Sequence, residues 1–239
     1  MKYIYGPLAS RRLGMSLGVS LTPYKVCSFD CVYCQLGKTG EKTLRRKEYF
    51  PIKDILVELK AWRKTHPAQL RDIDCITLSG SGEPTLNRGI AELIRGIKKL
   101  TSIPVAVITN ASLLSDPLVR KGLLNADLIV PSLDAVSPEV FTRIDRPHKK
   151  IKIEQVIAGL AALKKEFQGK IWLEVMLVRG INDDLRHIGR LKEAIARINP
   201  DKIQLNSPVR ATAEPGLLAV PRAKLEKIKA ILGAKCEIV

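Results

Sequence analysis

The sequence predicts an α/β protein with a parallel sheet, and more specifically a partial (β/α)6 barrel. Short apolar strand segments alternate six times with helical segments, which implies parallel strands joined by right-handed crossovers. The strands are almost continuously apolar, as is typical of a sheet that helices cover. A doubly wound open sheet would explain these two observations equally well. The barrel is favoured because polar residues gather where the strands end, and ligands bind at the carboxyl ends of parallel strands.

The first three strand–helix units occupy the first half of the chain. The segment 15–24 reads as a strand that enters a cysteine-rich loop. Helix 51–65 has apolar residues at helical spacing and Pro51 in its first turn. Residues 73–80 form a buried apolar strand, and helix 88–100 follows it. The third unit has a strand at 103–110 and a short helix at 115–124. Ser-Asp-Pro stands at the start of that helix.

The last three units repeat the same pattern. Apolar strands are predicted at 126–134, 170–180 and 201–209, and helices at 152–167, 183–198 and 222–232. No linker or shift in composition divides the chain, so we expect one domain over residues 1–239. Its core would span about 15–210, and a C-terminal helix and strand would occupy 211–239.

The composition indicates a globular protein inside the cell. Hydrophobic residues make up 46% of the 239 residues, enough for a buried core, and no apolar run has transmembrane length. The N-terminus lacks the continuous apolar core of a signal peptide, so we expect a cytoplasmic protein. We also expect the protein to be a monomer. Five cysteines, three of them within eight residues, argue against a disulfide framework and favour metal or redox chemistry.

The charge of the chain is strongly positive. Forty Lys and Arg against 24 Asp and Glu give a net charge of +16, which attracts nucleic acid or another polyanion over long range. The alternative is that these residues only cover solvated helix faces. Aromatic residues make up 5% of the chain, so no stacking platform for bases is evident.

The stretch VCSFDCVYCQLGKTG places Cys27, Cys31 and Cys34 in one loop. A structural zinc site is usually built from two close pairs of ligands, and no second pair exists here. Iron–sulfur clusters normally take four cysteines, so three would leave one iron of a four-iron cluster open to a substrate. A fully ligated electron carrier or iron–sulfur sensor is the non-enzymatic alternative. Cys75 and Cys236 are expected to be small hydrophobic residues buried in strands.

The spacing Cys-x3-Cys-x2-Cys, with Tyr33 before the last cysteine, resembles that of the radical S-adenosylmethionine (SAM) superfamily. The resemblance implies a partial (β/α)6 barrel in which the open iron of a 4Fe-4S cluster chelates the amino and carboxylate groups of SAM. An electron from an external donor of the flavodoxin or ferredoxin type would cleave SAM. The products would be methionine and a 5′-deoxyadenosyl radical that removes hydrogen from a substrate.

The stretch GSGEPTLN, after the second predicted strand, is similar to the glycine-rich Gly-Gly-Glu element of that superfamily. Gly80 and Gly82 would let the backbone approach a ligand closely, and Glu83 would accept a hydrogen bond from the methionyl ammonium group. The resemblance implies further SAM contacts from the backbone of the cysteine loop and from the ends of later strands. These candidates are Tyr33, Asn110, Ser132, Asp134, Glu174 and Asn182.

Over almost its whole length the chain is similar to the 4-demethylwyosine synthases of wybutosine biosynthesis, which modify tRNA. The matching stretches include IYGPLASRRLG, LSGSGEPTLN, PSLDA, IDRPH, LVRGIND and QLNSPVR. Those enzymes bind a second iron–sulfur cluster through cysteines upstream of the SAM motif. This chain has no cysteine before Cys27, so the resemblance does not by itself imply the same reaction.

Three substrate classes remain open. RNA, with a tRNA base first, is favoured by the net charge, and the segments 43–49 and 146–154 are its contact candidates. A protein or peptide substrate would suit a small activating or modifying enzyme. A small anionic metabolite would suit arginines on the rim, because their planar fork matches carboxylate and phosphate. The candidates for that role are Arg146, Arg179 and Arg210.

Overall fold

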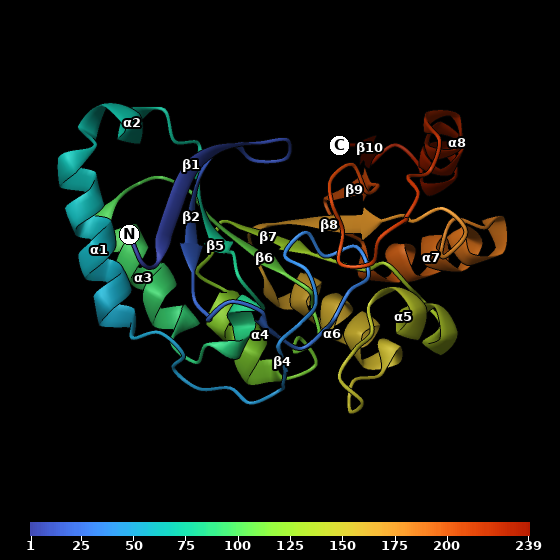
Figure 1. Ribbon diagram of the computed structural model, residues 1–239, viewed down its shortest axis with the longest axis horizontal. Coiled ribbons are helices and arrows are strands. Elements are labelled where there is room, and N and C mark those ends of the chain that lie inside the picture. The colour runs from blue at the N-terminus through green and yellow to red at the C-terminus, as the bar shows by residue number, and fades with distance from the viewer.

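The computed structural model describes residues 1–239 and shows an α/β fold around one eight-stranded sheet (Figure 1). The strands lie in the order β1-β2-β5-β6-β7-β8-β9-β10. In Figure 1 they turn from upright at β2 to horizontal at β8, so the sheet twists strongly across its width. Their bounds are Ile4–Ser10 (β1), Gly14–Ser20 (β2), Cys75–Ser79 (β5), Val105–Thr109 (β6), Leu128–Pro131 (β7), Lys170–Met176 (β8), Lys202–Asn206 (β9) and Cys236–Ile238 (β10).

Neighbouring strands from β2 to β10 are parallel, and their order in the sheet follows their order in the chain. A doubly wound sheet requires a reversal of strand order, and none occurs here. The two edge strands, β1 and β10, are not paired with each other, so the barrel stays open on one side. The predicted partial barrel is therefore confirmed, and its six predicted strands are β2, β5, β6, β7, β8 and β9.

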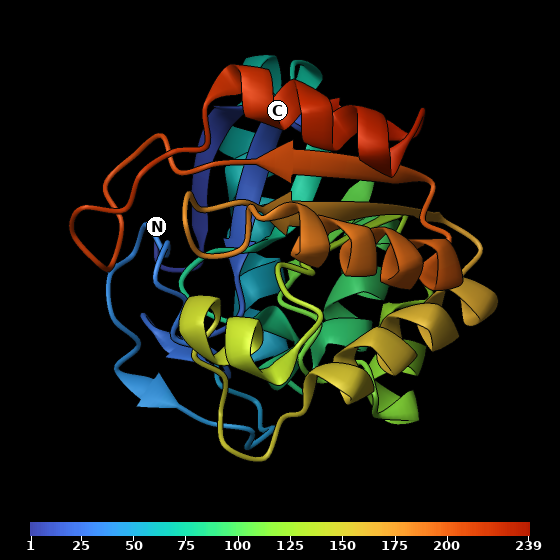
Figure 2. The same cartoon turned by 90° about the vertical axis from the view of Figure 1, so that its right-hand side faces the viewer.

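The helices connect the strands and pack on the outside of the sheet (Figures 1 and 2). Two short helices, α2 (Pro67–Arg71) and α5 (Pro138–Ile144), are absent from the sequence prediction because each is too short to show a helical repeat of apolar residues. None of the helices is long and apolar enough to cross a membrane. The six predicted helices are α1 (Ile52–Thr65), α3 (Ile90–Leu100), α4 (Pro117–Leu123), α6 (Ile153–Glu166), α7 (Leu185–Ile198) and α8 (Arg222–Leu232).

The N-terminal strand β1 is the main addition to the predicted fold. It pairs antiparallel with β2, and the register shifts between Tyr5 and Leu8, around a proline that has no backbone N–H to offer. The turn between the two strands, residues 11–13, reaches toward the ends of β9 and β10 (Figure 1). This hairpin therefore lies across the open side of the barrel.

Alternation along the strands separates the hydrophobic core from the barrel interior. Leu17, Ile76 and Val107 are fully buried in a connected core of 54 residues, and burial of each such side chain contributes about 1.5–3 kcal/mol. The residues next to them point the other way because side chains alternate along a strand. Ser16 and Thr77 are two of these neighbours, and both line a cavity inside the barrel. The interior therefore carries polar side chains from which a site is built.

Candidate active site

The cysteine loop, residues 21–50, follows the carboxyl end of β2 and precedes α1. Cys27 ends the two-residue strand β3 (Val26–Cys27), which pairs in parallel with β4 (Glu41–Lys42). The N–H of Cys34 donates to the carbonyl of Cys31 at 3.1 Å, which forms a tight turn. All three thiols are free and half-buried. The loop thus presents them at the edge of the sheet where parallel strands end.

Two of these thiols lie beside N–H donors. The Nδ2 group of Asn110, just after β6, is 3.5 Å from Sγ of Cys27. The Nζ group of Lys25 is 3.1 Å from Sγ of Cys34, and this lysine is buried with a left-handed φ of +58°. Hydrogen bonds to ligand sulfur stabilise metal-bound thiolates and tune the metal. Lys25 and Asn110 are therefore suited to support a cluster held by the loop.

The loop suits a four-iron cluster better than a single metal ion. No group of three or more His, Cys, Asp or Glu side chains is placed to hold one ion. In a four-iron cluster each thiolate binds a different iron, so the thiolates stay apart. The other two cysteines, Cys75 in β5 and Cys236 in β10, are buried as predicted. Three loop thiols with N–H donors beside two of them therefore fit such a cluster with one iron left without a protein ligand.

Burial favours the protonated form of two of the loop thiols, those of Cys27 and Cys31. Desolvation raises the pKa of Cys27 to about 12, and the nearby Glu83 carboxylate adds to the rise. Desolvation also raises the pKa of Cys31 well above its ordinary value, with Asp145 as the next cause. Iron binds thiolates, so cluster assembly would release these protons.

The glycine loop, residues 80–83, packs directly against the cysteine loop. The N–H of Glu83 donates to the carbonyl of Val26 at 3.1 Å. A Cβ atom at Gly82 would collide with that same carbonyl, and Gly80 has a φ of +107°, which favours glycine. Gly82 therefore allows one protein loop to approach another, whereas a Cβ at Gly80 would meet the side chain of Ser20 at the end of β2.

Glu83 is buried, and its carboxylate is engaged inside the protein. Its Oε1 atom accepts hydrogen bonds from the N–H and hydroxyl of Thr85, in the short helix η1 (Pro84–Leu86), and from the hydroxyl of Thr109. Its Oε2 atom accepts from the N–H of Asn110 at 2.8 Å. Burial raises the pKa of Glu83, although these bonds oppose the rise. The side chain ties the glycine loop to the end of β6, and a SAM ammonium group would have to compete with these bonds.

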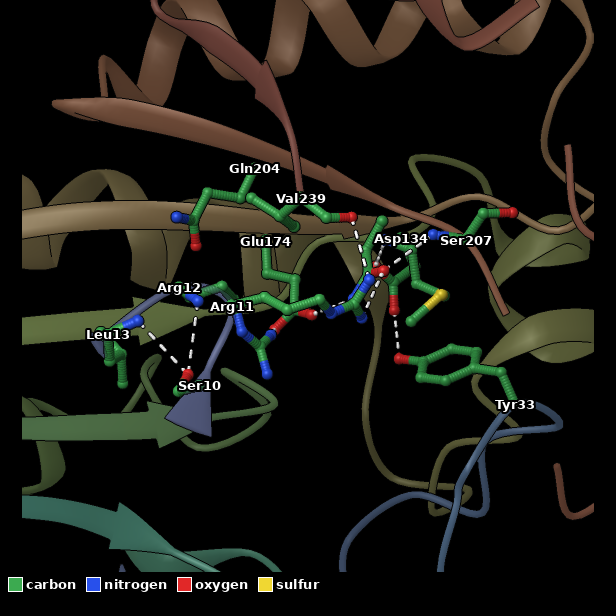
Figure 3. A network of polar contacts seen from close by, with 12 residues as sticks. Ser10, Arg11, Arg12, Leu13, Tyr33, Asp134, Glu174, Gln204, Ser207 and Val239 are labelled. Carbon is green, nitrogen blue, oxygen red and sulfur yellow. Dashed lines mark hydrogen bonds and ion pairs between the residues drawn. The ribbon is translucent and has the colours of Figure 1, made fainter. Parts of the chain in front are cut away.

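A buried acidic cluster lies behind the cysteine loop. The hydroxyl of Tyr33 donates to Oδ2 of Asp134 (Figure 3), and the N–H of Met176 donates to Oδ1 at 2.7 Å. Burial raises the pKa of Asp134 to about 7. Burial, and then the charge of Asp134, raise the pKa of Asp145, whose Oδ1 is 3.5 Å from Sγ of Cys31. The Tyr33 side chain is thus used inside the protein, which leaves its backbone for the adenine contact that the resemblance implies.

Two other residues predicted to contact SAM, Ser132 and Asn182, differ in whether their side chains are already hydrogen-bonded within the protein. Ser132, just after β7, is half-buried, and its hydroxyl makes no hydrogen bond within the protein. Asn182 is fully buried and donates to the carbonyls of Asp134 and Met176, at 2.8 Å each. Its Oδ1 accepts from the N–H of Val178 at 2.8 Å. Asn182 therefore fixes the loop after β8, and any contact of that loop with SAM falls to its backbone.

Glu174 of β8 faces the barrel interior and pairs with an arginine that the sequence prediction misses. Its carboxylate forms an ion pair with Arg12 of the β1–β2 turn and accepts from Nδ2 of Asn206 at 3.2 Å. The neighbouring Arg11 donates to Oδ1 of Asn206 at 3.2 Å and to the carbonyl oxygen of Val239 at 3.1 Å. Figure 3 shows both arginines reaching from the turn toward Glu174 and the end of the chain. The turn thus bonds to β8, to β9 and to the residue that follows β10, on the far side of the opening.

A cavity of about 390 Å³ lies beneath this turn. Its wall includes Cys31 and Cys34, so the cavity reaches the cysteine loop. The opposite wall carries hydroxyl groups from β1, β2 and β5, which are those of Tyr5, Ser16, Thr77 and Ser79. A molecule inside would therefore lie between the predicted cluster loop and the hairpin.

The three arginines predicted to hold an anion do not lie together in the structure. Arg210 lines the cavity. Arg146 forms an ion pair with Glu214 at 2.5 Å, and Arg179 is exposed outside the cavity. The sequence prediction assigns no role to four residues that the structure brings to the site. Three of them lie in the quoted stretches IYGPLASRRLG and IDRPH, and the fourth precedes the cysteines; they are Arg11, Arg12, Asp145 and Lys25.

Comparison with known proteins agrees with this geometry. Residues 21–191 match the protein-family model of the Radical SAM superfamily. The chain is 39% identical over 237 residues to the GTPase Obg of Brachyspira hyodysenteriae; the match covers 99% of this chain but 34% of that relative. It is 34% identical over 239 residues to a UPF0026 protein of Methanocaldococcus jannaschii, of which the match covers 73%.

A solved structure shares the fold. The structure of TYW1 with a lysine-pyruvate adduct bound aligns with a TM-score of 0.66 at 22% identity, and the alignment covers 91% of this chain and 72% of that one. At this identity the likeness shows the fold alone. It agrees with the partial barrel that the strand order establishes.

Proposed function

We propose that this chain, which belongs to the radical SAM superfamily and is related to its UPF0026 proteins, cleaves SAM reductively at a 4Fe-4S cluster held by three cysteines. The bound cluster and SAM would supply a 5′-deoxyadenosyl radical, which abstracts hydrogen from a substrate. One observation carries the proposal: three cysteines share one loop beside a cavity, while the remaining two are buried in distant strands.

The residues of the chain divide the work of binding. Cys27, Cys31 and Cys34 would hold the cluster, and Lys25 and Asn110 would donate to two of the sulfurs. The backbones of the cysteine loop and the glycine loop, with a free serine hydroxyl after β7, would contact SAM. The hairpin and the strands would exclude water, because a primary radical reacts with any hydrogen donor that reaches it.

RNA, with a tRNA base first, is the substrate class that we favour. The two segments expected to contact RNA lie near each other, because Nζ of Lys42, just before the first segment, donates to the carbonyl of Arg146 at 3.1 Å. Desolvation and the charges of nearby lysines lower the pKa of His148 in the second segment. This basic patch would attract phosphates together with the net charge of +16. Its exposed basic residues are Lys42, Arg45, Lys47, Lys149, Lys150 and Lys152.

The remaining parts of the proposal concern partners and compartment. A protein or peptide substrate is an alternative to RNA, and so is a small anionic metabolite, which the arginines of the cavity favour. An electron carrier or sensor that is not an enzyme would have its cluster fully ligated by protein, which three cysteines do not provide. We propose a monomer that accepts electrons from a flavodoxin or a ferredoxin. We place it in the cytoplasm, where its five free cysteines stay reduced.

The yield of 5′-deoxyadenosine tests the proposed function. The protein is reconstituted anaerobically with iron and sulfide, then given SAM and dithionite. We expect product from the wild type and none from Cys31→Ala. The matched control Cys75→Ala should keep the activity, because that thiol is buried in β5 away from the loop. A loaded four-iron cluster that forms no deoxyadenosine would contradict the proposal.

Bulk tRNA tests the favoured substrate class in the same assay. We expect tRNA to raise the deoxyadenosine yield, and the stimulation to fall steeply as salt is added. Neutralising the basic patch with Lys149→Gln and Lys150→Gln should weaken that stimulation without changing the basal yield. Stimulation by small anions and none by tRNA would count against RNA.

A further inference from the structure

We propose that the open side of the barrel is an anion-binding site, in which Arg11 and Arg210 hold a phosphate or carboxylate group of the substrate. The inference rests on the function proposed above and specifies what the substrate carries. Arg11 comes from the β1–β2 turn, and Arg210 comes from the loop between β9 and α8. Both side chains line the cavity on the open side of the barrel, and they come from segments far apart in the chain.

The charges that line the cavity are not balanced. Apart from the two cysteines assigned to the cluster, its charged side chains are three arginines and one carboxylate, that of Glu174, and these four leave an excess of two positive charges. Arg12 takes up that carboxylate in an ion pair. Neither Arg11 nor Arg210 forms an ion pair with an Asp or Glu side chain. A bound anion would balance this positive charge.

The hydrogen bonds of these two arginines leave donors free. Arg11 donates to the amide oxygen of Asn206 and to a main-chain oxygen of the final residue, Val239, through two of its five N–H groups. Arg210 reaches only the amide oxygen of Gln35, at 3.4 Å. A guanidinium group offers five N–H donors in a planar fork that matches carboxylate and phosphate oxygens. Both side chains therefore keep N–H groups that an entering oxyanion would accept.

The position of the pair suits a substrate better than SAM. Cys31 and Cys34 lie on the wall of the same cavity, so a molecule anchored by the arginines would extend toward the cluster loop. The resemblance described above gives the carboxylate of SAM to the open iron. That assignment leaves the arginines without an anion from the cofactor. Their field, focused by the walls of a cleft, would draw an anionic substrate inward.

Chemical modification of arginine tests the site one residue at a time. The reconstituted protein, saturated with SAM, is treated with phenylglyoxal, and the modified arginines are quantified by peptide mass spectrometry. The probes are cytidine 5′-monophosphate, succinate, uncharged cytidine, and sodium chloride at matched ionic strength. We expect one or both of the two anions to slow the modification of Arg11 and Arg210 at least fivefold. Cytidine and chloride should have little effect, and so should any probe on the exposed Arg186 of α7.

Variants separate recognition from folding. Arg11→Gln and Arg210→Gln should each weaken binding of the protecting anion at least tenfold in calorimetry. Arg210→Lys should keep part of the affinity because it keeps the charge, and Arg186→Gln should bind as the wild type does. The SAM affinity and melting temperature of every variant should stay close to wild type. A loss of SAM binding in parallel with anion binding would assign the arginines to the cofactor and overturn the proposal.

The outcomes distinguish the sources of the anion. Protection by cytidine monophosphate alone supports a phosphate, protection by succinate alone supports a carboxylate, and both support the site. No protection by either anion, or full protection by SAM alone, overturns it. Since modification is read without turnover, an enzyme that forms deoxyadenosine but shows no protection loses only this inference. Protection without deoxyadenosine would instead count against the proposed function.

Discussion

The cysteine side and the arginine side of the cavity satisfy their polar groups in opposite ways. Around the cysteine loop, Glu83, Asp134 and Asn182 are buried, and other protein groups bond both oxygens of each carboxylate and both ends of the amide. Among the residues that line the cavity, Arg11 of the β1–β2 turn and Arg210, which reaches Gln35, form no ion pair with an Asp or Glu side chain. A closed network suits a resident group whose position must not change. Unpaired charge suits a ligand that enters and leaves.

The strongest way to break the cysteine side is Gly82→Ala. The added Cβ would overlap the carbonyl of Val26, and backbone cannot swing aside as a flexible side chain would. We expect a loss of about 3 kcal/mol in the free energy of unfolding, together with most of the bound iron. Urea denaturation and iron analysis measure the two effects. Wild-type iron content in a stable variant would show that the loops do not need this close packing.

Gly189→Ala is the matched control for that change. Gly189 lies within α7, and nothing stands within 4 Å of an added Cβ. Alanine is the better helix former, so the free energy of unfolding should rise by up to about 1 kcal/mol with unchanged iron content.

On the arginine side, Arg12→Gln most directly disrupts the contact between the β1–β2 turn and β8. The change leaves the Glu174 carboxylate buried with only Asn206 beside it. We expect a loss of about 2 kcal/mol, because a buried charge without its partner is costly. Adding Glu174→Gln should recover part of that loss. Arg222→Gln, at an exposed ion pair with Glu226, should cost less than about 0.5 kcal/mol. If Arg12→Gln and Arg222→Gln lowered the free energy of unfolding equally, the Arg12–Glu174 pair would stabilise the protein no more than an exposed ion pair does.

Asp134 gives the cysteine side a pH dependence with a defined sign. Burial raises its pKa to about 7, against about 3.9 in the unfolded chain, so the folded state retains a proton that the unfolded state releases between these values. The contribution of this group to stability is therefore full below about pH 4 and is lost as the pH rises to 7. Asp134→Asn should flatten that decline and raise the free energy of unfolding at pH 8, by on the order of 1–2 kcal/mol. An unchanged slope between pH 4 and 8 would assign the titration to another group.

Lys25 links the cysteine side to electron transfer. Its ammonium group, 3.1 Å from Sγ of Cys34, would stabilise the reduced cluster because reduction adds negative charge. Lys25→Met should lower the midpoint potential by roughly 30 mV, which is less than about 1 kcal/mol for one electron. Lys25→Gln keeps an N–H donor without the charge, so it separates the two effects. A potential that stays constant in both variants would exclude this role.

The part of the molecule that the sequence predicts well is the part encoded locally. Apolar runs place the six parallel strands, and the spacing of Cys27, Cys31 and Cys34 identifies the loop without any knowledge of the fold. The strand β1 escapes detection because IYGPLAS contains glycine and proline, which are rare within strands and are tolerated here at a sheet edge.

The part that the sequence does not predict depends on contacts between distant segments. Arg12 meets Glu174 only because an antiparallel hairpin crosses the open side of the barrel. The sequence marks Glu83 as a ligand acceptor, but the rotamer that turns its carboxylate toward Thr109 is set by packing at the end of β6. Motifs therefore identify which residues matter here, and the structure decides what each one touches.

The most direct test of the three-cysteine cluster is the electron paramagnetic resonance spectrum of the reduced, reconstituted protein with and without SAM. We predict the signal of one four-iron cluster per chain and a clear change in its g values when SAM binds the free iron, with the same change in Cys75→Ala. A fully loaded four-iron cluster whose spectrum is identical with and without SAM would contradict the open iron.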